Sequence, residues 1–293
     1  MQVLLRRKLS TYAARDRFQP AILAGFIVVH LGALLAPWCY TQYSIPLLVV
    51  GWFLTGCLGI AIGYHRLLSH KSFDTHQWVR YALAFLGTLS VQGGPVEWVS
   101  YHRTHHKESD KPLDVHTPQA GFWWGHMNWI FFKHPALSDD ALWSRAKDLA
   151  NDPFFRFLDK NFAIVNLVLG VILFAVGFAV GDIKTAFSFL VWGGFLRVIF
   201  TWHIIFSVNS MCHKFGYRNF ETPENSYNNP VVAIFSFGEG WHNNHHAHPC
   251  SASFTHQPYE FDVSFVVIRI MEMMGLVWNV REAKVKDAKR STS

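Results

Sequence analysis

Eight of the 17 histidines in this sequence gather in three short segments. The first segment is His65-Arg-Leu-Leu-Ser-His70, and the segments 102–106 and 242–246 share the pattern HxxHH. Residues three and four apart on a helix lie on one face. The outer two histidines of an HxxHH segment can therefore reach one metal ion, and the middle histidine points aside towards a second ion.

Imidazole nitrogen is a ligand for iron, zinc, copper and nickel. Two HxxHH segments that face each other would hold two such ions close together. Asn209 and His213 are four residues apart, so they share a helix face and form a further donor pair. The other histidines are isolated or peripheral, and we expect them not to be ligands: His30, His76, His116, His126, His134, His203, His248 and His256.

Four apolar segments are long enough to cross a bilayer, which takes about 20 residues: 20–37, 44–64, 163–180 and 186–206. The connections 38–43 and 181–185 contain Lys184 as their only Lys or Arg, whereas most cationic residues lie in the N-terminal arm, in 65–162 and after 207. The positive-inside rule places those three regions in the cytoplasm. No cleaved signal peptide is expected.

The predicted fold is an all-α integral membrane protein with four transmembrane helices in two hairpins. A cytoplasmic helical cap, from 65–162 and 207–280, would hold the metals, and 1–293 would form a single domain with both termini cytoplasmic. A bacterial inner membrane or its equivalent is the expected location.

A weaker apolar run over 81–92 stops at Gly93-Gly94-Pro95 and is too short to span. We expect a helix that lies at or dips into the interface, which keeps the second histidine segment on the same side as the other two. Arg197 lies inside the last apolar segment, where a charge is often functional but can also snorkel to the interface. The sequence favours neither role for Arg197 over the other.

Composition agrees with a membrane protein, since only 16% of residues are charged, against about 25% in soluble domains. The net charge of +6 fits anionic lipid rather than nucleic acid. The four cysteines contain no CxxC pair, so we expect small buried residues rather than a disulfide framework or a thiolate zinc site.

The sequence resembles the membrane fatty acyl desaturase family, which includes stearoyl-CoA desaturases and cyanobacterial acyl-lipid desaturases. The resemblance covers about residues 20–280 and looks closest to the short bacterial and cyanobacterial members. The matching stretches are Gly63-Tyr-His-Arg-Leu-Leu-Ser-His70, Glu97-Trp-Val-Ser-Tyr-His-Arg-Thr-His-His-Lys107, Asn209-Ser-Met-Cys-His213 and Gly238-Glu-Gly-Trp-His-Asn-Asn-His-His246.

The resemblance implies two iron ions and no catalytic side chain beyond their ligands. One iron would be held by His65, His70, His102, His106 and His245, and the other by His105, His213, His242, His246 and, through a water, Asn209. It also implies that Gln92 and Trp98 bind substrate at a bend in an apolar tunnel, although Trp98 could equally be core. Thr201-Trp202 stands one helical turn before the place where the family often has a Thr-Trp pair, so the tunnel shape is not carried over.

The implied reaction is O₂-dependent desaturation of a long-chain saturated acyl group, with a cis double bond at Δ9. Two electrons would come from a separate donor, a ferredoxin or a small haem protein, because the chain contains no flavin or dinucleotide motif. Acyl chain length, head group, the identity of the donor and oligomeric state stay open.

Other functions are weighed against this one. A membrane di-iron hydroxylase would use the same metal centre. A metal transporter is a second class, and a haem-bearing subunit is disfavoured because its histidines would lie within the spans. A zinc hydrolase would use Glu97 or Glu239 as its base.

Overall fold

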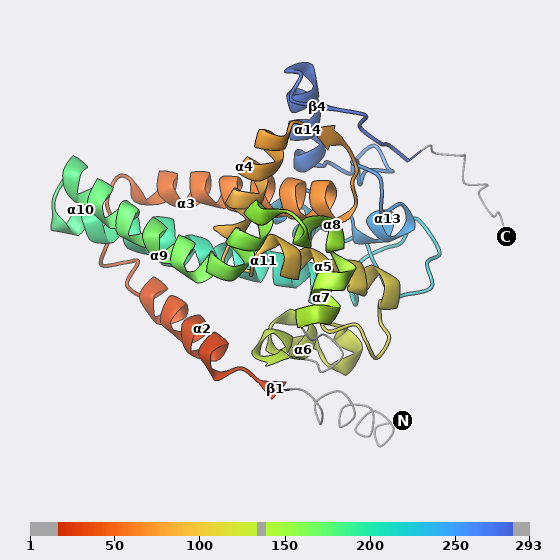
Figure 1. Cartoon of the computed structure of the whole chain (residues 1–293), viewed down its shortest axis with the longest axis horizontal. Coiled ribbons are helices and arrows are strands. Elements are labelled where there is room, and N and C mark those ends of the chain that lie inside the picture. The colour runs from red at the N-terminus through yellow and green to blue at the C-terminus, as the bar shows by residue number, and fades with distance from the viewer. Residues whose placement is uncertain (1–16, 134–138, 284–293) are drawn as a thin grey trace.

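The computed structural model describes residues 17–133 and 139–283, and the regular structure there is almost entirely helical (Figure 1). Two short antiparallel strand pairs join distant segments. β1 (Arg17–Phe18) pairs with β3 (Phe132–Lys133), and β2 (Asp74–Thr75) pairs with β4 (Val277–Trp278). The predicted all-α class is confirmed, because these four strands of two residues each only fasten helices together.

Three continuous helices among the described residues are long and apolar enough to cross a membrane: Ser44–Ser69, Pro153–Val180 and Ile183–Met211. The first comprises α3 (Ser44–Trp52) and the π-helical η1 (Phe53–Ser69), and the second is α9 (Pro153–Val180). The third comprises α10 (Ile183–Ser188), the π-helical η5 (Phe189–Leu196) and α11 (Arg197–Met211). Each extends beyond the predicted segment, so His65 lies within a long helix and not after it.

The first predicted segment, 20–37, is shorter as a helix than the sequence suggests. α2 (Pro20–Ala33) has 14 residues, which is about 21 Å at 1.5 Å per residue, and a hydrocarbon core is about 30 Å thick. The chain turns after Ala33. Pro37 accounts for this, because proline lacks a backbone donor and disfavours helical backbone in the residue before it.

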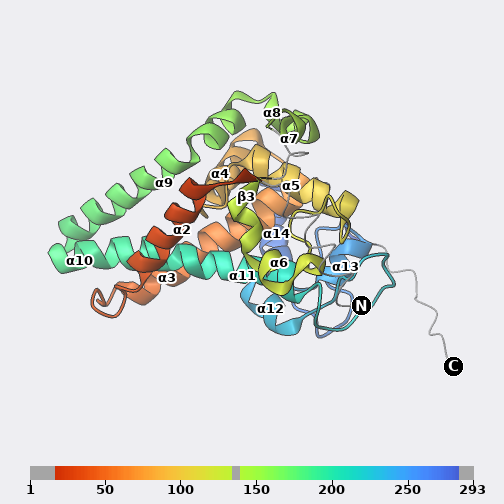
Figure 2. The ribbon, with the colours of Figure 1, turned by 90° about the horizontal axis from the view of Figure 1, so that it is seen from below.

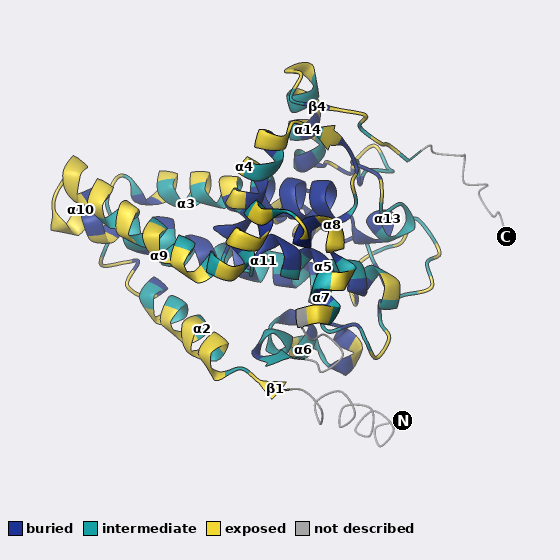
Figure 3. Cartoon of the chain, in the orientation of Figure 1, coloured by how far each residue is buried: buried dark blue, intermediate teal, exposed yellow. Residues whose placement is uncertain are grey.

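The long helices expose apolar side chains along their outer faces. In the most apolar 18-residue window of α9 only 6% of residues are buried, and Leu167 and Val171 are 69% and 62% exposed. Figure 3 shows exposed residues along α2, α9 and α10, and buried ones at the opposite end around α5, α8 and α13. An apolar surface of this extent marks a face that contacts lipid or another protein, and the length and apolarity of these helices suit a membrane.

The short helix α4 (Gln77–Thr88) packs backbone to backbone on η1. A Cβ atom at Gly59 would lie 2.5 Å from the backbone nitrogen of Gly87, and one at Gly87 would lie 2.4 Å from the ring of Tyr64. Small residues allow such close approach between helices in membranes. The helix begins and ends four residues before the predicted run 81–92, and its 12 residues are, as predicted, too few to cross a bilayer.

The carboxyl end of α4 lies inside the protein, where its free carbonyl groups need donors. Asn166 Nδ2 donates to Thr88 O at 2.9 Å, and Arg197 Nη1 donates to Leu89 O at 2.8 Å. Trp202 Nε1 donates to the carbonyl oxygens of residues 90 and 91 at 3.0 and 3.1 Å. Arg197 is only 3% exposed, so the snorkelling interpretation is wrong. Its guanidinium instead donates to a free carbonyl group at the carboxyl end of α4.

α5 (Pro95–Glu108) follows a sharp turn in which Gly93 has φ +94°. Asp159 Oδ1 accepts hydrogen bonds from the backbone N–H groups of Val96 and Glu97, both at 3.0 Å. A carboxylate at this position satisfies free donors and complements the helix dipole. The contact fixes the start of α5, and therefore the second histidine segment, against α9.

The remaining helices surround the histidine-bearing end (Figures 1 and 2). They are η2 (Pro118–Ala120), α6 (Phe122–His126), η3 (Asn128–Phe131), α7 (Asp139–Arg145), α8 (Lys147–Ala150), α12 (Pro230–Phe235), α13 (His242–Ala247) and α14 (Val263–Met273). Asn228 Oδ1 accepts from the backbone N–H groups of Asn243 and Asn244 at 3.0 and 3.2 Å. These bonds orient α13, which carries the third histidine segment.

Candidate metal centre

The nine predicted histidines converge at one end of the long helices and form two groups. The members of each group place one ring nitrogen apiece within 4.8 Å of one another. The five-histidine group is His65, His70, His102, His106 and His245, and the four-histidine group is His105, His213, His242 and His246. This is the same division that the family resemblance implied. Whether these side chains bind metal stays a prediction.

α5 and α13 contribute in opposite senses. The outer histidines of α5, His102 and His106, join the five-histidine group, and its middle one, His105, joins the other. The outer histidines of α13, at 242 and 246, join the four-histidine group, and its middle one joins the five-histidine group. The two HxxHH segments therefore face each other and each serves both groups, as the helical spacing predicts.

The separations between ring nitrogens fit metal coordination. In the five-histidine group His70 Nε2 lies 2.7 Å from His102 Nε2, and His245 Nε2 lies 2.8 Å from His106 Nε2. In the four-histidine group Nε2 of His213 lies 3.0 Å from that of His242. Adjacent ligands at about 2.1 Å from an ion are about 3 Å apart. The donor set and its spacing therefore fit one ion in each group.

Burial favours the neutral form of the rings in both HxxHH segments. Desolvation, and then the neighbouring imidazoles, hold the pKa of His102 and His242 well below the ordinary value for histidine. The same causes lower the pKa of His106 and His246. A neutral imidazole offers the lone pair that a metal requires.

A buried ionic network supports the five-histidine group. Glu239 bonds His65 Nδ1 through one oxygen, and its other oxygen lies 3.0 Å from Arg66 Nη2. Arg66 also pairs with Asp262 at 3.0 Å and lies over the ring of Phe254 at 3.9 Å. A carboxylate on Nδ1 fixes the tautomer that presents Nε2 to the metal. Burial raises the pKa of Glu239, and the buried guanidinium of Arg66 opposes that shift by stabilising the carboxylate.

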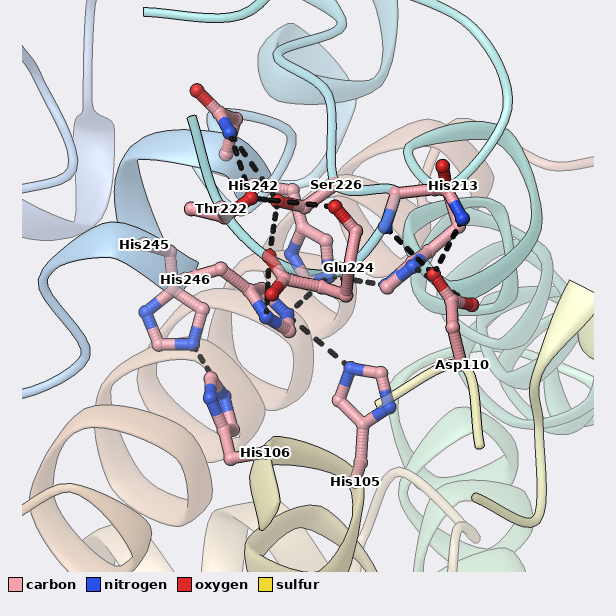
Figure 4. A network of polar contacts seen from close by, with 12 residues as sticks. His105, His106, Asp110, His213, Thr222, Glu224, Ser226, His242, His245 and His246 are labelled. Atoms are coloured by element: carbon pink, nitrogen blue, oxygen red, sulfur yellow. Dashed lines mark hydrogen bonds and ion pairs between the residues drawn. The ribbon is translucent and has the colours of Figure 1, made fainter. Parts of the chain in front are cut away.

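Three other carboxylates face the four-histidine group, and Figure 4 shows two of them, Asp110 and Glu224. Asp114 Oδ2 lies 3.1 Å from His105 Nδ1, Asp110 Oδ1 lies 3.6 Å from His213 Nδ1, and Glu224 Oε1 lies 3.4 Å from His246 Nδ1. Burial alone would raise the pKa of Asp110, but its contacts with His213 and Asn225 lower it. This carboxylate is therefore ionised.

None of these four carboxylates was predicted as a partner of the histidines. The sequence suggests a role for Glu239 only as the base of a hydrolase. Asp110 and Asp114 follow the second histidine segment at intervals of four residues, which is a weak signal. Glu224 lies in an irregular loop 18 residues before the third segment, and no local pattern marks it.

The two predicted substrate residues lie at the turn between α4 and α5 and on α5. The ring of Trp98 stacks on His102, with centroids 5.1 Å apart and planes at 17°. Gln92 follows Val91, which has φ +59°, and its buried Nε2 has no hydrogen-bond partner among the described residues. Asn209 lies on α11, four residues before His213. Their roles toward substrate and metal stay predictions.

Several histidines that the sequence leaves isolated have partners in the fold. His203 lies 3.1 Å from His30 Nε2 and 3.0 Å from His126 Nε2, through its two ring nitrogens. His116 lies beside His105 and Asp114 in a third set of close donor atoms. His76, by contrast, lies away from other histidines: its Nε2 is 3.3 Å from Gly275 O, and its ring meets that of Trp278 with centroids 4.9 Å apart. His134 lies outside the described residues.

Comparison with known proteins identifies the class. The model for the fatty acid desaturase family matches residues 41–264. The chain is 40% identical over 263 residues to the sn-1 stearoyl-lipid 9-desaturase of Anabaena variabilis, covering 89% of this chain and 93% of that one. It is 40% identical over 257 residues to the sn-2 palmitoyl-lipid 9-desaturase of Nostoc sp. (strain 36), covering 87% of each.

A plant relative shows the breadth of the match: the icosanoyl-CoA 5-desaturase of Limnanthes douglasii is 37% identical over 286 residues, covering 96% of this chain and 78% of that one. The chain belongs to the fatty acid desaturase family, which confirms the resemblance drawn from its histidine segments. It is a desaturase, an oxidoreductase of lipid metabolism.

Proposed function

We propose that this chain is a membrane-bound di-iron desaturase that places a cis double bond at Δ9 of a saturated acyl chain carried by a glycerolipid. The observation that carries the proposal is the pair of buried histidine groups in a chain of the desaturase family. The named functions of the cyanobacterial relatives support the Δ9 position and the lipid head group. A hydroxylase is not favoured, because the relatives compared are desaturases.

The five-histidine group would hold one iron, and the four-histidine group would hold the other, with Asn209 reaching it through a water. When bound, the pair supplies the O₂ chemistry that removes two hydrogens from unactivated methylenes, which no side chain is basic enough to do. The balanced reaction consumes the saturated acyl chain, O₂, two electrons and two protons, and it produces the alkene and two waters. A ferredoxin or small haem protein would supply the electrons.

The protein's own contribution is position and the exclusion of water. Trp98 lies flat against His102 and would form one wall of the acyl tunnel beside the metals. Gln92, at the bend between α4 and α5, would form part of the same wall. The carboxylates behind the rings hold the imidazoles in one tautomer.

For the topology we propose four spans in two hairpins, with α2 and the turn after it as the first. Three long apolar helices and the charge distribution support this. β1, which precedes α2, pairs with β3, which follows the second histidine segment. The start of α2 would then lie on the side of the metal centre, which we assign to the cytoplasm together with both termini. The whole chain, 1–293, would be a single domain in a bacterial inner membrane or its equivalent.

Expression in a host that lacks desaturases, followed by mass spectrometry of the lipids, tests the proposal. Feeding saturated acids of 15 to 18 carbons should give double bonds at a constant distance from the carboxyl end, because the polar head cannot enter the apolar tunnel. Hydroxylated chains would instead indicate a hydroxylase. A bond that moves with chain length would show that the tunnel measures from the methyl end.

A further inference from the structure

The carboxylates behind the two histidine groups are unequally distributed. In the four-histidine group, three of the four rings face a carboxylate through Nδ1, at 3.1, 3.4 and 3.6 Å. In the five-histidine group, His65 faces Glu239. Nδ1 of His245 is buried without a hydrogen-bond partner among the described residues, as are Nδ1 of His213 and of His242 in the other group, although Asp110 Oδ1 lies 3.6 Å from that of His213. The two groups therefore differ in the number of carboxylates behind their rings, although the histidines that form both groups offer the same kind of donor atom.

Cations increase this inequality. Glu239 shares its charge with Arg66, whose guanidinium is completely buried and lies 3.0 Å from a Glu239 oxygen. Asp110, Asp114 and Glu224 are held instead by neutral donors. Asn225 N donates to Asp110 Oδ2 at 2.7 Å, and Ser226 Oγ donates to Glu224 Oε1 at 2.7 Å. Within the described part of the chain, the ionic contacts of these three carboxylates are with histidine rings alone.

We infer that the four-histidine group binds the first and more tightly held of two divalent ions, because three uncompensated carboxylates lie behind its imidazoles. This inference rests on the proposed metal centre, and it adds an order of filling and names the positioning residues that set it: Asp110, Asp114 and Glu224. Figure 4 shows Asp110 beside His213 and Glu224 beside His246.

One feature works against this order, since the other group has a fifth imidazole. A fifth imidazole replaces a water on the ion, so one neutral dipole is exchanged for another. A carboxylate behind a ring displaces no ligand, adds a net negative charge near the cation, and makes the ring more basic. Loss of one such partner weakens metal binding by about 10- to 100-fold. Three carboxylates therefore outweigh one additional imidazole.

Titration of metal-free protein in detergent with Co²⁺, followed by its visible absorption, tests the inference without relying on activity. Wild type should take up two ions in two steps. Asp110→Asn should weaken the first step by about 10- to 100-fold and leave the second unchanged. The substitution removes the charge with little change of shape, and asparagine tolerates the φ of +60° found at this position.

Glu224→Gln, in a different loop, should weaken the same step. Asp74→Asn is the matched control, because this exposed carboxylate accepts from Asn279 Nδ2 at 2.8 Å in the β2–β4 pair rather than facing a histidine ring, and both steps should stay as in wild type. If Asp110→Asn weakens the second step, both steps equally, or neither, the inference is wrong. Uptake of both ions in one step that the variants do not split would also overturn it. Failure of wild type to bind two ions would instead refute the proposed metal centre.

Discussion

The two ends of this molecule bury different kinds of side chain: polar and charged ones are buried at the histidine end, and apolar ones are exposed along the long helices. At the histidine end, carboxylates, amides and a completely buried arginine interlock inside the protein. Along α9 the apolar side chains lie outside, with Leu167 69% exposed. A buried charge is costly unless each member of its network is paired, whereas an apolar side chain in lipid has no such requirement. Substitutions should therefore be severe at one end and mild at the other.

The largest effect is expected at the histidines themselves. Replacing His106 or His242 with Ala should abolish desaturation, because each belongs to one of the two groups and no other side chain can take its place. The matched control is His256→Ala, which should keep most of the activity. Product lipids measured by mass spectrometry, normalised to protein amount, give the answer. Near-normal turnover by His242→Ala would show that the site assignment is wrong.

The next effect concerns the buried ionic network. Arg66→Met should lower the free energy of unfolding by about 3–5 kcal/mol, since it leaves two buried carboxylates without their cation. Arg269→Met, on a half-exposed arginine whose partner Glu272 is also accessible, should change it by less than about 1 kcal/mol. Thermal unfolding in detergent compares the two. Equal losses would mean that the network is not required at this end of the molecule.

The two ends of the molecule should also lie on different sides of the membrane. A reporter fused after Ser293 should behave as cytoplasmic, and one inserted near Gln42 as external, since the connection 38–43 contains no Lys or Arg. A control fusion within the polar segment around Lys111 should match the first. The reverse pattern would refute the proposed orientation.

The smallest effect is expected on the outer face of α9. Leu167→Ala should change stability by about 0.5 kcal/mol or less, because the side chain is exposed and leaves no cavity. Leu158→Ala, on the same helix but completely buried, should cost about 2–5 kcal/mol. Both are measured by the same thermal assay. A large loss at Leu167 would show that this face packs against protein rather than lipid.

The sequence predicts the histidine end well because its information is local. The HxxHH spacing alone assigns the outer and middle histidines of α5 and α13 to different groups, and the structure separates them in this way. Apolar run length predicts the long helices, although not their ends: Pro37 shortens α2, and η1 continues past His65.

Contacts between distant segments could not be predicted. Glu224 lies in an irregular loop and contacts His246. Arg197 donates to Leu89 O at the carboxyl end of α4, although the two residues are 108 positions apart in the sequence. Neither position belongs to a periodic pattern, and a lone charge in an apolar segment fits several roles. Which ring or carbonyl group each of these two side chains contacts is decided only by the packing of the helices and loops.

The central claim is that each histidine group holds one ion, and the metal content of the purified protein tests it most directly. Elemental analysis of the active enzyme should give two irons per chain. Zinc recovered after overexpression would not contradict the claim, because zinc competes well with ferrous iron for imidazole. One iron per chain in a fully active preparation would contradict it.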